Sequence, residues 1–114
     1  MRTPASINAD LASATIIRRL EFSTDLRSGR CSLVLDLLDD HRCPTTRIIV
    51  EARGVSEWQT QGLGGGITQL MCLCAKDVSD QQHDRVRIFL EDLENGALSL
   101  KCEELVTTRV PVDV

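Results

Sequence analysis

The segment from Arg85 to Leu105, RVRIFLEDLENGALSLKCEEL, constrains the fold more than any other part of the chain. Apolar and polar residues alternate on both sides of Asn95-Gly96, which is typical of two strands joined by a tight turn. A two-residue turn at Asn95-Gly96 would place Leu90 opposite Lys101, so that neither face of the hairpin would be uniformly apolar.

A three-residue loop, Glu94-Asn95-Gly96 with a left-handed Gly96, gives a better register. In this register Leu90 faces Leu100 and Ile88 faces Cys102, and a slip of one residue would exchange the two faces. The apolar face then consists of Val86, Ile88, Leu90, Leu98, Leu100 and Cys102. The other face is expected to pair Arg87 with Glu103 and Phe89 with Lys101, and Asp92 and Glu94 flank an acidic tip.

The rest of the chain carries similar strand patterns. Further strands are expected at 14–23, 31–38, 47–52, 55–60, 67–75 and 106–112. Together with the hairpin they predict a mainly β fold, an antiparallel sandwich or partly open barrel of about 7–8 short strands. Residues 1–13 are rich in turn and cap residues and are expected to form an N-terminal arm, followed by one β domain over 14–114.

Composition excludes several classes of function. The chain has a net charge of −4 and 3% aromatic residues, which disfavours nucleic-acid binding because that needs a basic surface and stacking platforms. The sequence has no secretory segment and no apolar run of the length that spans a membrane. With five cysteines, an odd number, these features predict a cytoplasmic protein with free thiols.

Two groups of residues could carry chemistry. His41-x-Cys43 and Cys72-x-Cys74 together contain four potential zinc ligands, but Cys-x-Cys within an apolar strand is not a zinc knuckle, so no metal and no cofactor are expected. The glycine-rich run 62–66 lacks the context of a phosphate-binding loop and is interpreted as a bend. An enzyme using His41 and Cys43, or a small β-barrel with a ligand pocket near this run, remains the alternative.

Acidic side chains at the turns offer a contact surface for a protein partner. Carboxylates on a rigid hairpin steer association with a basic partner, and a tryptophan on a short strand is a common anchor of an interface. The candidate partner-binding residues are Asp39, Asp40, Trp58, Glu91, Asp92 and Glu94. No catalytic residue is predicted.

The order of motifs between residues 50 and 104 resembles a known family. Gly54-Val55 is followed by Leu63-Gly64-Gly65-Gly66-Ile67-Thr68-Gln69, by Asp77-Val78-Ser79, by Glu91-Asp92-Leu93-Glu94 and by Leu98-Ser99-Leu100-Lys101-Cys102. This order resembles small bacterial β proteins that lie beside polymorphic or contact-dependent toxins and act as immunity proteins. The resemblance implies a cytosolic protein that binds and blocks one toxin domain, and it carries over no functional residue.

The acidic turns and the resemblance together predict a non-enzymatic binding protein that occludes the active site of a cognate toxin. A nuclease is the natural target, because nuclease clefts are basic where they hold phosphates. The expected partner is therefore a basic toxin domain, with no nucleic acid and no membrane bound, and the chain itself is expected to be a monomer or a homodimer.

Overall fold

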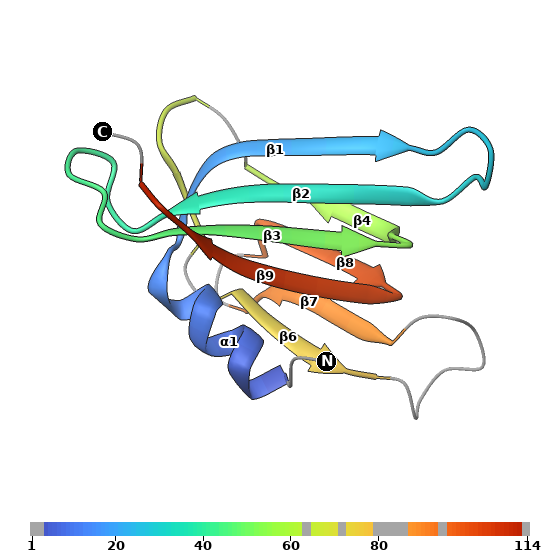
Figure 1. Cartoon of the computed structure of the whole chain (residues 1–114). Coiled ribbons are helices and arrows are strands. Elements are labelled where there is room, and N and C mark those ends of the chain that lie inside the picture. The colour runs from blue at the N-terminus through green and yellow to red at the C-terminus, as the bar shows by residue number, and fades with distance from the viewer. Residues whose placement is uncertain (1–3, 63–64, 71–72, 79–86, 94–95, 113–114) are drawn as a thin grey trace.

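The fold is a sandwich of two antiparallel β-sheets with one helix at its side (Figure 1). The computed structural model describes residues 4–62, 65–70, 73–78, 87–93 and 96–112. Within these ranges, one sheet has the strand order β5-β1-β2-β3-β9 and the other has the order β4-β8-β7-β6. The prediction of a mainly β, antiparallel sandwich is confirmed, and the two sheets do not close into a barrel.

The elements follow the alternating runs of the sequence closely. The five-stranded sheet contains β1 (Ile16–Thr24), β2 (Cys31–Leu38), β3 (Arg47–Arg53), β5 (Thr68–Gln69) and β9 (Glu104–Val110). The four-stranded sheet contains β4 (Ser56–Thr60), β6 (Leu73–Asp77), β7 (Ile88–Asp92) and β8 (Leu98–Cys102). Helix α1 covers Pro4–Ser13.

The core lies between the sheets and is almost entirely aliphatic. Leu33, Leu35 and Leu37 of β2 are buried in the same core cluster as Leu98 and Leu100 of β8, which belongs to the other sheet. Because side chains alternate along a strand, the residues between them point away from the core. One face of each sheet is thereby left for solvent or a partner.

The register of the β7–β8 hairpin is the one that the three-residue loop predicts. Leu90 pairs with Leu100, Ile88 with Cys102 and Phe89 with Lys101. Gly96 has a φ of 62°, the left-handed conformation that this loop requires.

Burial in the core raises the pKa of the Cys102 thiol to about 12, so this cysteine behaves as a small apolar residue.

The ion pair expected between Arg87 and Glu103 is replaced by another. The Glu103 carboxylate accepts a hydrogen bond from Arg30 Nη2 at 3.1 Å. Glu103 lies where the chain leaves the four-stranded sheet and enters β9, and its backbone N–H donates to the Arg53 carbonyl. It packs over Gly54, where an added Cβ would lie 2.0 Å from Glu103 Oε2. The side chain therefore closes a corner between the two sheets.

The expected continuous strand at 67–75 is wrong. Thr68–Gln69 forms β5 and pairs with Ile16 and Ile17 at the edge of the five-stranded sheet, whereas Leu73–Asp77 forms β6 in the other sheet. The run therefore crosses from one layer to the other, and its buried residues are Leu70, Leu73 and Ala75, whereas Ile67 is 60% exposed. Residues 71 and 72 lie outside the described ranges.

The N-terminal segment is not an arm but part of the packed fold. Pro4–Ser13 is helical, and Ile7 and Leu11 are each only 1% exposed within the core. The Asn8 side chain donates to the Ala75 carbonyl at 3.1 Å and accepts from the Ala75 N–H at 2.7 Å, as a neighbouring strand would.

In the described ranges, no helix is long and apolar enough to span a bilayer.

Candidate functional site

The loop that joins β2 to β3, residues 39–46, is a braced structure that projects from one end of the sandwich (Figure 1). The Asp39 carboxylate accepts hydrogen bonds from the Thr45 N–H at 2.9 Å, from the Thr46 N–H at 3.0 Å and from the Thr45 hydroxyl. The Asp39 N–H in turn donates to the Thr46 carbonyl at 3.2 Å. One aspartate thus ties both ends of the loop together and fixes its shape.

These hydrogen bonds also fix the charge of Asp39. The Thr45 hydroxyl, followed by the two backbone N–H groups, lowers the carboxyl pKa from 3.8 to about 2. Since the folded pKa is below the unfolded one, the stabilisation is fully present above pH 3.8 and is lost as the pH falls toward 2. A carboxyl titration followed by NMR is expected to give a midpoint near 2 for Asp39.

Removing this brace should loosen the loop without unfolding the sandwich. Asp39→Ala is expected to speed amide hydrogen exchange at Thr45 and Thr46, because both N–H groups lose their acceptor. Asp40→Ala is the matched control, since the Asp40 carboxylate accepts from the Arg42 N–H instead. Equal exchange at Thr45 and Thr46 in the wild type and in Asp39→Ala would contradict the bracing role.

The tip of the loop presents polar side chains to solvent. Asp40, His41, Arg42 and Cys43 are all exposed. Asp40 Oδ1 accepts from the Arg42 N–H at 3.0 Å and lies 3.8 Å from His41 Nδ1. The loop therefore offers a carboxylate, an imidazole and a guanidinium on a backbone whose conformation is already set.

Of the residues expected at the acidic tip of the β7–β8 hairpin, Asp92 is buried. Asp92 is only 2% exposed, and its Oδ2 accepts from the Ala97 N–H at 3.3 Å across the turn. Asp92 is therefore a buried acceptor inside the hairpin, and its proposed contact with a partner is wrong. Glu91 lies on the outer face of its sheet, and its Oε1 is 3.8 Å from Lys76 Nζ. Glu94 lies outside the described residues.

Trp58 occupies a different part of the molecule from these turns. Its ring stacks on Phe22 of β1, with a centroid separation of 5.1 Å and an interplanar angle of 22°. Trp58 is half-buried against the core, whereas Phe22 is 40% exposed. The two strands that carry them, β4 and β1, belong to different sheets, so the pair bridges the open side of the sandwich.

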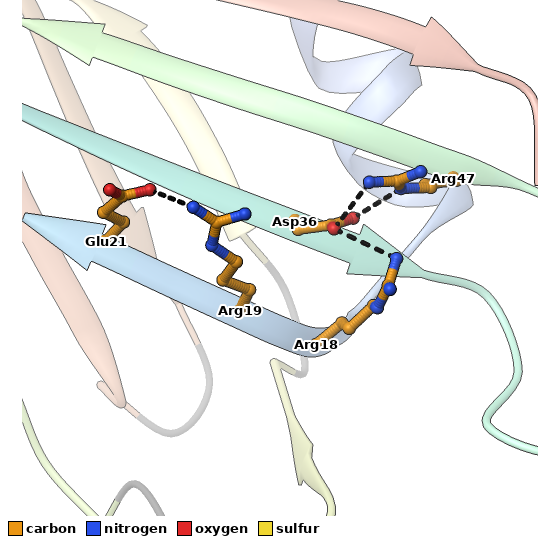
Figure 2. A network of polar contacts seen from close by, with 5 residues as sticks. All are labelled: Arg18, Arg19, Glu21, Asp36 and Arg47. Carbon is orange, nitrogen blue, oxygen red and sulfur yellow. Dashed lines mark hydrogen bonds and ion pairs between the residues drawn. The ribbon is translucent and has the colours of Figure 1, made fainter.

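A network around Asp36 on the outer face of the five-stranded sheet was missed from the sequence (Figure 2). Asp36 is 3% exposed and accepts from Arg47 Nε and Nη2, both at 2.9 Å, and from Arg18 Nη1 at 3.4 Å. Arg19 pairs with Glu21 beside it. The alternation of β2 places Asp36 on this face, but only the neighbouring strands show that two arginines cover it.

The residues considered for a metal site do not converge. His41 and Cys43 lie in the β2–β3 loop, whereas Cys74 belongs to β6 in the other sheet, and Cys72 is outside the described ranges. Within the part of the chain that the structure describes, no group of three or more His, Cys, Asp or Glu residues could hold a metal ion.

Comparison of the chain with models of known protein families, with curated proteins and with solved structures returned no match. The function is therefore inferred from the geometry of the β2–β3 loop.

Proposed function

We propose that this chain is a non-enzymatic binding protein, and most concretely an immunity protein that neutralises a bacterial toxin domain in the cytoplasm by covering its active site. The observation that carries the proposal is the braced β2–β3 loop with its exposed tip. A loop that is already ordered loses little conformational entropy when it binds, and more of the contact energy then appears as affinity.

Charge favours a basic target. Asp39 and the exposed Asp40 outnumber Arg42 in the loop, so the net charge of the loop is negative. A toxin cleft that binds phosphates attracts such carboxylates, and the attraction speeds encounter more than it raises final affinity. Of the residues expected to contact the partner, Asp39 and Asp40 remain on this surface, while Trp58 and the buried Asp92 do not belong to it.

Protection of cells against the toxin tests the proposal. A toxin domain encoded beside this chain should kill cells that express it alone and spare cells that also express the chain. Asp40→Lys should reduce the protection, because it reverses the charge at the exposed tip and slows encounter with a basic toxin.

Glu104→Lys is the matched control for this charge reversal. The side chains of Glu104 and Asp40 are similarly exposed, at 54% and 51%. Glu104 pairs with Arg53 at the opposite end of the five-stranded sheet, since β3 and β9 run from Arg47–Val110 to Arg53–Glu104. Absence of protection by the wild-type chain would refute the proposed function, and equal protection by both variants would remove the loop from it.

A further inference from the structure

The outer edge of β1 is open over most of its length. β5 pairs with β1 only at Ile16 and Ile17, and the strand is interrupted by an irregularity at Arg18. From Leu20 to Thr24, β1 pairs with β2 on one side and with no described strand on the other. In Figure 1 this stretch forms the free border of the five-stranded sheet. Unpaired strand edges with regular geometry are templates for another strand.

Two other edges of the sandwich are protected against such pairing. Asn8 of α1 bonds to both backbone groups of Ala75 on β6, which occupies that edge. On β4, Glu57 has a φ of 50° at a register shift, and such a bulge distorts an edge so that a straight strand cannot pair with it. Between Leu20 and Thr24 the described structure shows neither a covering helix nor a bulge at the β1 edge, and Phe22 on this stretch is exposed.

The backbone direction along this edge can be worked out. The Asp25 N–H donates to the Arg30 carbonyl at 2.8 Å, in the same register that continues through the β1–β2 ladder. Because N–H and C=O groups alternate sides along a strand, those of Ser23 and Glu21 also point to β2. The groups of Leu20, Phe22 and Thr24 therefore point outward, ready to bond a further strand.

A second copy of the same strand could pair with this edge in symmetric antiparallel registers centred on Leu20, Glu21 or Phe22. A register centred on Leu20 would bring Ser23 of the second copy opposite Ile17, where Thr68 of β5 already pairs. A register centred on Glu21 would place two glutamates directly opposite each other, which is destabilising.

A register centred on Phe22 avoids both conflicts. Phe22 then faces Phe22 of the second copy, Leu20 faces Thr24, and the outward backbone groups of these residues bond in pairs. Arg19 comes opposite Asp25 of the second copy, so that opposite charges meet on both sides of the symmetry axis. The two Phe22–Trp58 stacks meet at the centre of the interface and bury apolar surface that one copy leaves exposed.

We propose that the chain forms a two-fold homodimer in which the β1 strands pair antiparallel about Phe22, joining the two five-stranded sheets into one. The second copy is a self-complementary partner for this edge in both charge and backbone direction. Because of the two-fold axis, the two β2–β3 loops would lie at opposite ends of the dimer. This proposal does not depend on the proposed function, because the dimer forms from the chain alone.

Sedimentation velocity of the purified full chain over a wide concentration range tests the dimer. The wild type should sediment as a dimer at high concentration, and Phe22→Asp should raise the dissociation constant by at least about tenfold, because two carboxylates would meet at the axis. Thermal unfolding of Phe22→Asp at low concentration checks that the monomer is folded. A monomeric wild type, or a folded Phe22→Asp variant that dimerises as the wild type does, would overturn the proposal.

Disulfide trapping tests the register itself. In a Cys43→Ser background, Phe22→Cys should form an intermolecular disulfide under mild oxidation, since directly opposed residues have Cα atoms about 5.5 Å apart. Ser23→Cys is the control, because Ser23 faces Glu21 of the second copy and not itself. Trapping at position 22 and not at 23 supports the register, whereas equal trapping at both, or trapping only at 23, contradicts it.

Discussion

Leu11→Ala is expected to lower the free energy of unfolding by about 2–5 kcal/mol, the usual cost of removing a buried leucine side chain from a core. Leu11 is 1% exposed and lies on α1 within the core cluster between the sheets. The loss would also weaken the neighbouring Asn8–Ala75 hydrogen bonds, which hold the helix to the edge of β6. Chemical denaturation followed by circular dichroism measures the change.

The same substitution at an exposed position serves as the control. Leu93 is 49% exposed, so Leu93→Ala should cost clearly less than Leu11→Ala. If the N-terminal segment were a detached arm, Leu11→Ala would leave the midpoint of unfolding unchanged. That result would contradict the packing of α1 described above.

Asp36→Ala is expected to lower the free energy of unfolding by about 2–3 kcal/mol. Removing one partner of a buried ion pair costs about 3–5 kcal/mol, because the other charge is left without compensation. The cost is smaller here because the side chains of Arg47 and Arg18 keep exposed fractions of 21% and 53%, which lets water solvate them. Denaturant unfolding at neutral pH is the measurement.

Glu21→Ala on the same face is the control for this network (Figure 2). Both members of the Arg19–Glu21 pair are more than half exposed, so their contribution is expected to be at most about 1 kcal/mol. If Asp36→Ala and Glu21→Ala lowered the free energy of unfolding equally, the buried Asp36 network would contribute no more than an exposed ion pair, which would contradict this prediction.

The strands could be predicted from the sequence because each has one buried face. Alternation located β2 at Cys31–Leu38, and turn chemistry at Gly96 selected the hairpin register in which Leu90 meets Leu100. The alternation of apolar and polar residues does not reveal where the chain passes from one sheet to the other. The run at 67–75 contains no glycine or proline, so nothing in its sequence marks the crossing from β5 in one sheet to β6 in the other.

The site was harder to predict because a carboxylate in the sequence does not reveal its partners. Asp92 and Asp40 both lie at turns, yet Asp92 is buried against the Ala97 N–H while Asp40 is exposed. Asp36 is buried through arginines from two other strands, and that contact depends on sheet order. The helix at Pro4–Ser13 was missed because its two buried apolar residues, Ile7 and Leu11, are too few to give a helical pattern.

We propose that the braced β2–β3 loop is the surface by which this chain binds a basic protein partner. The measurement is a calorimetric titration of the chain, at low and at raised salt, with a basic toxin domain taken from a gene adjacent to its own. The wild type and Glu104→Lys should bind with similar affinity that falls as salt increases, and Asp40→Lys should bind more weakly with a smaller salt dependence. Unchanged affinity and salt dependence in Asp40→Lys would contradict the claim.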